Sequence, residues 1–229
     1  MKITTIILAH FKQREQNLRP IIDSLKAGTV VPDNIIVFID NPEIQFPYFT
    51  DDVTIIRSSK SFLPIIRFAI GSVCEADYCF FLDDDLMVGK KTLENFREYS
   101  FLHHYSVLGL EGSILGHTEN PYSNDTSIKR GNTLVKVDIV IRTYFVPTSI
   151  LSCGLRLRAE YPDLPRTSLD DVFLCLGNKY LLGNENYAIP IDKDSDLTEL
   201  PDGGIGQSLS GDHYKNRNIV CWFLMKKYE

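Results

Sequence analysis

The chain has 229 residues, of which 44% are hydrophobic and 24% charged, and its formal net charge is −6. This composition is typical of a soluble globular protein with a sizeable core. Because the net charge is negative and no run of Lys and Arg is longer than two residues, we expect no nucleic-acid-binding surface. A small anionic ligand remains compatible with these numbers, since a local pocket can be positive on an acidic protein.

The cysteines and the N-terminus indicate the compartment. Five cysteines occur without a C-x-x-C pair, so neither a disulfide framework nor a zinc site is indicated. The opening "MKITTIILAHFKQRE" has no small-residue cleavage site and predicts a first strand, not a signal peptide. No apolar stretch approaches the ~20 residues that a membrane helix needs. We therefore expect a cytoplasmic protein.

The first ninety residues predict strands that alternate with helices. Leu18, Ile21, Ile22 and Leu25 follow the spacing of one helical face, and a second helix is expected over 63–75 with Ile66, Ile70 and Val73 turned inward. Apolar runs predict buried strands at residues 3–9, 34–40, 53–59 and 78–82. This alternation is typical of βαβ units, which build a mainly parallel sheet.

The rest of the chain is more mixed. We expect a helix over 91–102, strands over 107–112 and 133–146, and a helix over 167–180 that carries Leu169, Val172, Phe173 and Leu176 on one face. Residues 184–212 show little periodicity. The C-terminal "IVCWFLMKK" indicates a core-packing element, or alternatively a peripheral contact with a membrane surface. We expect a single domain over 1–229, with halves 1–89 and 90–229 joined by one continuous sheet.

Three adjacent carboxylates, Asp83, Asp84 and Asp85, directly follow the strand "YCFFL". Carboxylates this close repel one another unless a cation or hydrogen-bond donors compensate. In open α/β sheets ligands bind at the carboxyl ends of the strands, where these residues should lie. A divalent cation with a diphosphate would suit them. An acidic turn after an edge strand is the alternative.

Five segments, in order, resemble a known family of enzymes. They are "AHFKQRE" after the first strand, "FIDN" after the second, "IIRFA" with Arg67 sixteen residues before Asp83, "TSLDDVFLCLGN", and "SLSGDHYKNR". Together with the Asp-x-Asp after a strand, they resemble the GT-A glycosyltransferases, and among these the exostosin-like enzymes (family 64) and the family 2 enzymes. The implied fold is α/β, a Rossmann-like, mixed, mainly parallel sheet flanked by helices.

The resemblance implies a metal-dependent glycosyltransferase that moves a sugar from a nucleoside diphosphate donor, a UDP-sugar, to a hydroxyl of a glycan or lipid-linked acceptor. Residues 1–89 would bind the nucleotide, and 90–229 would face the acceptor and end in a metal and phosphate segment. Asp85 and His213 would hold Mn²⁺ or Mg²⁺, and Asp171, beside Asp170, would act on the acceptor or the anomeric carbon. The implied donor-binding residues are Phe11, Arg14, Asp40, Asn41, Arg67, Asp83, Asp84 and Arg217.

Several alternatives stay open from the residues alone. Thr167 and Ser168 read as capping-box partners of Asp170 and Asp171, so this acidic pair could simply begin a helix. Retention and inversion of the sugar are not distinguished. A pyrophosphorylase is disfavoured, because no Gly-rich loop follows the first strand. A non-catalytic nucleotide-sugar-binding module and a metal-dependent hydrolase remain. Residues 200–211 are rich in glycine, which suggests a lid over the donor.

Overall fold

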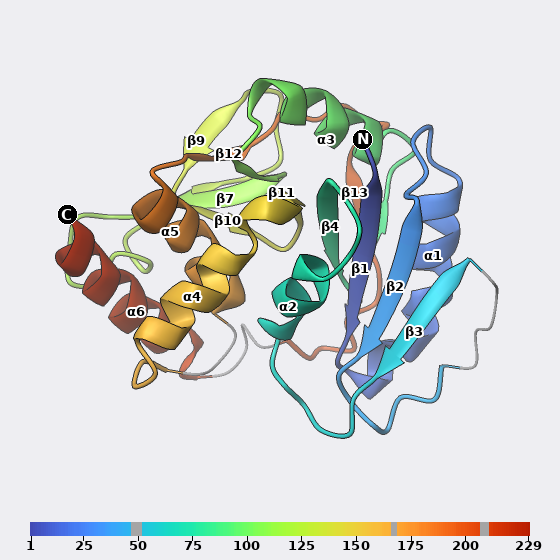
Figure 1. Cartoon of the computed structure of the whole chain (residues 1–229), viewed down its shortest axis with the longest axis horizontal. Helices are drawn as coiled ribbons and strands as arrows, with labels where there is room; N and C mark the ends of the chain where they lie inside the picture. The colour runs from blue at the N-terminus through green and yellow to red at the C-terminus, as the bar shows by residue number, and fades with distance from the viewer. Residues whose placement is uncertain (47–51, 166–168, 207–210) are drawn as a thin grey trace.

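The protein is a mixed α/β domain built around one large sheet (Figure 1). The computed structural model describes residues 1–46, 52–165, 169–206 and 211–229. Eight strands form the large sheet in the order β3-β2-β1-β4-β11-β6-β12-β9. They are β1 (Ile3–Ala9), β2 (Asn34–Ile39), β3 (Val53–Arg57), β4 (Tyr78–Asp83), β6 (Val107–Gly109), β9 (Val135–Val137), β11 (Tyr144–Pro147) and β12 (Asn186–Ala188).

The first four strands run parallel, with β1 between β2 and β4. Alternate side chains of these strands enter different cores. In β4, Cys79 and Phe81 join one buried cluster, whereas Phe80 and Leu82 join the other. β1, β2 and β4 are buried on both faces and therefore read as continuous apolar runs, whereas the edge strand β3 is only partly buried.

Strands of the second half extend the same sheet, as expected. β11 is antiparallel to both β4 and β6, while β12 is parallel to β6. Two small sheets flank it. One contains β10 (Ile139–Ile141), β7 (Glu111–Ile114) and β8 (Thr126–Ile128), and the other pairs β13 (Leu197–Glu199) with β5 (Leu86–Val88).

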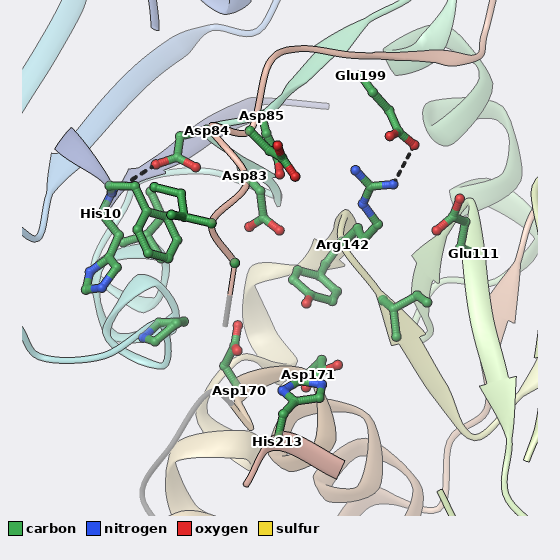
Figure 2. Close-up of a pocket in the computed structure, with 18 of the residues that line it drawn as sticks. His10, Asp83, Asp84, Asp85, Glu111, Arg142, Asp170, Asp171, Glu199 and His213 are labelled. Atoms are coloured by element: carbon green, nitrogen blue, oxygen red, sulfur yellow. Dashed lines mark hydrogen bonds and ion pairs between the residues drawn. The ribbon is translucent and has the colours of Figure 1, made fainter. Parts of the chain in front are cut away.

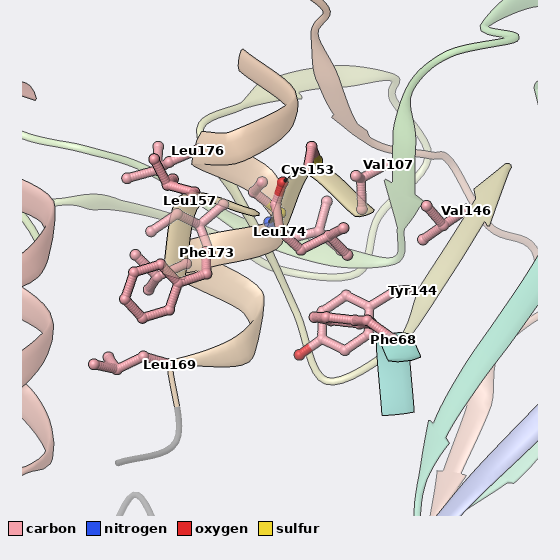
Figure 3. Close-up of a cluster of buried hydrophobic side chains, with 14 of the residues drawn as sticks. Phe68, Val107, Tyr144, Val146, Cys153, Leu157, Leu169, Phe173, Leu174 and Leu176 are labelled. Atoms are coloured by element: carbon pink, nitrogen blue, oxygen red, sulfur yellow. Dashed lines mark hydrogen bonds between the residues drawn. The ribbon is translucent and has the colours of Figure 1, made fainter. Parts of the chain in front are cut away.

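Helices cover both faces of the large sheet. The helices are α1 (Leu18–Lys26), α2 (Ile66–Ser72), α3 (Thr92–Leu102), α4 (Ser152–Glu160), α5 (Asp170–Leu182) and α6 (His213–Tyr228), with 3-10 turns η1 (Lys12–Asn17) and η2 (Thr148–Ile150). Side chains of α1 and α3 fill one core. Those of α2, α4, α5 and α6 fill the other, part of which Figure 3 shows around Phe68, Tyr144 and Phe173.

The residues predicted to be buried in α1 and α5 are buried, whereas the face predicted for α2 is right for Ile70, which packs partly buried against the core, and wrong for Val73. Leu18, Ile21, Ile22 and Leu25 are buried, as are the four predicted side chains of α5. In α2 the buried residues are Arg67, Phe68 and Gly71, and Val73 is 85% exposed. The helix ends at Ser72, so Val73 lies beyond it. At Gly71 a Cβ atom would lie 2.8 Å from Leu151 and 3.0 Å from Phe81, so glycine allows this close packing.

The single strand predicted over 133–146 is three separate strands. β9 belongs to the large sheet and β10 to a small one, and the chain changes sheet at Asp138. The carboxylate of Asp138 is held there, because it accepts hydrogen bonds from the Leu115 N–H (2.8 Å) and the Lys179 ammonium (3.0 Å). A sharp turn at Arg142 then separates β10 from β11. β12 and β13 lie in the stretch that showed little periodicity.

The C-terminal segment forms α6, which packs into the core through Val220, Cys221, Leu224 and Met225. Its residues Ile219 and Phe223 are 44% and 39% exposed. Within the described part of the chain, none of the helices has the length and apolarity required to cross a membrane.

Candidate active site

A cleft of about 700 Å³ lies at the carboxyl ends of β1 and β4. Asp83, Asp84 and Asp85 form one side of it (Figure 2). The start of α5, with Asp170 and Asp171, faces them from below in this view. Both acidic groups therefore line the same cleft.

Asp83 ends β4 and is tied to Arg67. Its Oδ1 atom lies 2.9 Å from Nη1 of Arg67, while 31% of the Asp83 side chain remains exposed to the cleft. Arg67 is almost fully buried, and its guanidinium packs 5.4 Å from the Tyr144 ring centroid. Burial alone would lower the pKa of Arg67, but the carboxylates of Asp170 and Asp83 raise it, so its charge is permanent. The negative charge of Asp83 is thus balanced by the guanidinium of Arg67.

Asp84 points into the protein. Its Oδ1 atom pairs with Nη1 of Arg14 at 2.9 Å, and its Oδ2 atom accepts hydrogen bonds from the N–H groups of His10 (3.1 Å) and Phe11 (3.4 Å). The residue is only 4% exposed. Burial raises the pKa of Asp84, against the effect of Arg14. This geometry favours a role in fixing the loop after β1 over direct contact with a donor.

Arg14 likewise uses its guanidinium within the protein. Nη1 contacts Asp85 at 3.0 Å as well as Asp84, Nε donates to the Asp202 carbonyl at 3.2 Å, and Nη2 donates to the Ile205 carbonyl. Arg14 therefore fastens residues 202–205 to the aspartate turn. The hypothesis of a lid over 200–211 includes residues 207–210, which lie outside the described residues.

Asp85 is the best candidate for a metal ligand. Its Oδ1 atom is buried and has no hydrogen-bond partner among the described residues. Burial and the neighbouring Asp83 carboxylate raise the pKa of Asp85 to about 6, although Arg14 lowers it. Nowhere in the described chain do three His, Cys, Asp or Glu side chains gather closely enough to hold a metal ion. One or two carboxylates nevertheless fit Mg²⁺ or Mn²⁺ when substrate phosphates complete the coordination.

Asp170 begins α5 and shares Arg67 with Asp83. Its Oδ2 atom lies 2.9 Å from Nη2 of Arg67. Burial raises the pKa of Asp170 to about 6, with Asp171 adding to the rise and Arg67 opposing it. The α5 N-cap is Leu169, which makes no side-chain cap hydrogen bond. The capping roles considered for Thr167 and Ser168 lie outside the described residues.

Asp171 pairs with Arg217 of α6. Its Oδ2 atom accepts a hydrogen bond from Nη2 of Arg217, and its Oδ1 atom accepts one from the Val172 N–H at 2.8 Å. The Arg217 guanidinium lies over the Tyr122 ring, 4.2 Å from its centroid. Both oxygens of Asp171 thus have partners before any substrate arrives.

His213 lies beside Asp171, whereas Asp85 is on the far side of the cleft (Figure 2). Burial and the nearby Arg217 lower the pKa of His213, so the imidazole is neutral at pH 7. The structure does not bring the two predicted metal ligands together.

Two predicted donor-binding residues do not line the cleft. Asp40 is fully buried and accepts hydrogen bonds from Ser61 Oγ and the Phe62 N–H, both at 2.7 Å. The side chain of Asn41 donates to the His10 carbonyl and accepts from the Glu43 N–H. Both side chains hold loops in place. Phe11, in contrast, lines the cleft, and the Arg14 guanidinium packs on its ring at 4.7 Å.

A third side of the cleft was not predicted. It carries Glu111, Arg130, Arg142 and Glu199, which come from β7, the β8–β9 loop, the β10–β11 turn and β13. Arg142 has φ 68°, and across it the Thr143 N–H donates to the Ile141 carbonyl at 2.8 Å, as in a γ-turn. Such backbone costs on the order of 1–3 kcal/mol outside glycine. No sequence pattern links these four residues, because they come together only through the fold.

Comparison with solved structures identifies the architecture. The chain superposes on Staphylococcus aureus TarS, a GT-A-type glycosyltransferase, in a crystal structure of residues 1–349 in complex with UDP-GlcNAc. The TM-score is 0.62 and the identity 16%, over 98% of this chain and 67% of that one. The chain has the GT-A fold.

Two further TarS structures agree. A second crystal structure of TarS residues 1–349 gives a TM-score of 0.57 at 14% identity, over 87% of this chain and 60% of that one. A longer TarS structure gives 0.53 at 14% identity, over 88% of this chain and 37% of that one. This chain therefore spans well under the full length of TarS. No protein-family model matches the chain, and no curated protein matches it by sequence.

Proposed function

We propose that the protein is a glycosyltransferase that moves a sugar from a nucleoside diphosphate donor, a UDP-sugar, to an acceptor hydroxyl. The observation that carries the proposal is the meeting of two acidic groups across one cleft of a GT-A fold. Asp83 and Asp85 come from the end of β4, Asp170 and Asp171 from the start of α5, and Arg67 lies between Asp83 and Asp170. The TarS structure with UDP-GlcNAc supports a donor of this class.

The donor diphosphate would lie at the aspartate side of the cleft. Asp85, with Asp83, would hold Mn²⁺ or Mg²⁺, which when bound supplies Lewis-acid stabilisation of the leaving diphosphate. Phe11 would pack against the base or ribose, since it offers an aromatic face at this end. Arg67 and Arg217 keep a positive charge beside each acidic group, and so limit repulsion of the anionic donor.

The acidic pair of α5 would act on the acceptor. Asp171 is the candidate general base if the sugar is inverted, or the carboxylate that stabilises the positive anomeric carbon if it is retained. Either role requires the Arg217 guanidinium to yield one oxygen of Asp171 or to share it. The carboxylate of Asp170 lies next to that of Asp171 at the start of α5.

The proposal is tested by calorimetry with a panel of nucleotide sugars, each with Mn²⁺, Mg²⁺ or EDTA. We expect the native protein to bind one UDP-sugar only when the metal is present, and to transfer its sugar to an acceptor. In the Asp85→Asn variant, the metal should no longer increase binding of this UDP-sugar, or binding should be lost. If no nucleotide sugar binds under any condition, the proposal is wrong.

A non-catalytic nucleotide-sugar-binding module is the second candidate. The observation in its favour is that both oxygens of Asp171 are already hydrogen-bonded, one to a buried guanidinium. Such a module would bind the same donor but neither transfer nor hydrolyse the sugar, which product analysis distinguishes.

A further inference from the structure

The C-terminal helix α6 is apolar on every side over residues 219–225, although only one side packs against the rest of the described chain. The packed side enters the core through Val220, Cys221, Leu224 and Met225. On the other side, Ile219 and Phe223 are 44% and 39% exposed. A helix segment that is apolar all round is normally covered on every side. The exposed side of α6 is therefore expected to have a partner.

Lysines extend this exposed side at both ends of its apolar centre. The side chains at positions 215, 219, 222 and 226 follow the spacing i, i+4, i+7 and i+11, which places them in one row along the helix. In Figure 1, α6 lies at the left edge of the molecule, away from the large sheet. The outer face of α6, as we call this side, consists of Lys215, Ile219, Trp222, Phe223, Lys226 and Lys227.

The three lysines of the outer face carry positive charge that the protein does not balance. Within the described chain, α6 forms ion pairs through Arg217 and Glu229 and none through these lysines. Lys226 instead lies over the ring of Trp222, with Nζ 4.4 Å from the ring centroid. Asp212, at the N-cap, is a carboxylate beside this face, whereas the charge of Glu229 is balanced by its own ion pair. The outer face is therefore positive on a protein whose formal net charge is −6.

The surface of an anionic lipid bilayer fits this combination of charge and apolar area. Helices that lie in the plane of a membrane interface bury an apolar side that carries Trp and Phe, while their lysines remain at the level of the lipid phosphates. Tryptophan is enriched at this depth, because its ring is apolar and its N–H is polar. A second copy of the chain fits less well, since a two-fold contact would bring the lysines of one copy against those of the other.

We propose that the outer face of α6 binds the surface of an anionic bilayer, with its apolar side chains among the lipid headgroups and its lysines at the lipid phosphates. This inference does not depend on the proposed function. It has a consequence for the cleft, because His213 and Arg217, in the first two turns of α6, line it. A bilayer bound along α6 would therefore lie close to one end of the cleft.

Trp222 can report this contact directly, because it is the single tryptophan of the chain. The native protein is mixed with vesicles of phosphatidylcholine alone, or of equal parts phosphatidylcholine and phosphatidylglycerol, at low and at high salt. Co-sedimentation measures binding, and the emission maximum of Trp222 measures whether its ring leaves water. We expect binding to the anionic vesicles only, with a shift of the emission to shorter wavelength. Added salt should weaken the binding, because it screens the lysines.

Two variants separate the charged from the apolar part of the outer face. Lys215→Gln/Lys226→Gln should weaken binding to the anionic vesicles about 30-fold, the effect of two lysines near a charged membrane surface. Ile219→Ser should weaken it about fivefold, because it removes apolar area at an exposed position. The matched control is Lys60→Gln/Lys193→Gln, which removes the same charge at two exposed positions outside α6, one of them also over an aromatic ring. The thermal midpoint of each variant verifies that it is folded.

Four results would overturn the inference. They are no binding to the anionic vesicles at low salt, binding with unchanged Trp222 emission, equal binding to vesicles of phosphatidylcholine alone, and a loss in the control variant as large as that in Lys215→Gln/Lys226→Gln. If the Trp222 emission shifts with rising protein concentration in the absence of vesicles, a second copy covers the outer face and the inference is also wrong. The experiment contains neither a nucleotide sugar nor an acceptor, so its outcome is separate from that of the proposed function.

Discussion

The guanidinium of Arg67 joins Asp83 of the first half of the chain to Asp170 of the second, with Nη1 and Nη2 each 2.9 Å from a carboxylate oxygen. One buried cation therefore connects the end of β4 to the start of α5. It also sets the separation of the two acidic groups on which the proposed function depends.

Replacement of Arg67 by Met should destabilise the protein strongly. The variant leaves two carboxylates, one of them almost fully buried, without their cation, and breaking a buried pair in this way costs about 3–5 kcal/mol. Urea denaturation measures the change. The matched control is Arg156→Met, whose partner Glu160 lies on the exposed face of α4 and which should cost less than about 1 kcal/mol. Equal effects of the two variants would show that Arg67 has no special structural role.

Much of this fold could be predicted because its central strands are continuous apolar runs, because α1 has one clear buried face, and because α5 is apolar enough to be buried on all sides over residues 170–178. The face predicted for α2 was incomplete for a physical reason, since it included Ile70 but not the most buried residues. Arg67 and Gly71 occupy its buried side, the first through two ion pairs and the second through close packing on β4, and neither side chain is apolar and large. The break at Asp138 depends on Lys179 and the Leu115 N–H, which are distant in sequence.

The residues of the candidate site also fall into those that the sequence could predict and those that it could not. Residues that directly follow a strand or begin a helix, such as Asp83, Asp85 and Asp171, were predicted to lie in the cleft and do line it. Asp40 also follows a strand, yet the segment with Ser61 and Phe62 covers it. The third side of the cleft escaped prediction, because Glu111 and Glu199 are far apart in the sequence and are brought together by their ion pairs with Arg130.

Asp84 and Asp85 should respond differently to the same substitution. Asp84→Asn removes a buried charge that pairs with Arg14, so we expect a loss of about 3 kcal/mol or more in the free energy of unfolding. Asp85→Asn removes a carboxylate whose pKa is raised to about 6 by burial and Asp83, so its ionised form lowers stability at pH 7 and the substitution should not destabilise the protein. Calorimetry with UDP and Mn²⁺ should instead detect the loss of metal-dependent binding. Binding by Asp85→Asn equal to that of the native protein would exclude Asp85 as the ligand.

Because the pKa of Asp170 is raised, we predict that the free energy of unfolding depends on pH through this residue. Its folded pKa, about 6, exceeds the ordinary value of 3.8 for an aspartate, so the folded state binds more protons between these two pH values. Ionisation of Asp170 therefore removes stability as the pH rises from about 4 to about 6. Asp170→Asn lacks this loss. Relative to the native protein, the variant should gain between about 1 and 3 kcal/mol from pH 4.5 to pH 7.5.

Denaturation curves of both proteins at the two pH values give this difference without reference to the absolute cost of the substitution. The neighbouring Asp171 carboxylate adds to the raised pKa of Asp170, so the double variant Asp170→Asn/Asp171→Asn provides the control for coupling between them. A difference in stability that does not depend on pH would mean that Asp170 titrates as an ordinary carboxylate.

Asp171 is expected to act in the chemical step. We predict that Asp171→Asn lowers kcat by about 10²–10⁴, the usual contribution of a general base, while donor affinity is kept. Because its Oδ2 atom pairs with Arg217, the asparagine should also cost stability, and folding must be checked by the thermal midpoint. The control is Asp138→Asn, which removes a more exposed ion pair to the same helix, with Lys179 of α5 at 3.0 Å, outside the cleft. If Asp138→Asn lowers kcat as much, the loss reflects a disturbed helix. If Asp171→Asn keeps full kcat, the catalytic carboxylate is elsewhere in the cleft, and Asp170 becomes the residue to replace next.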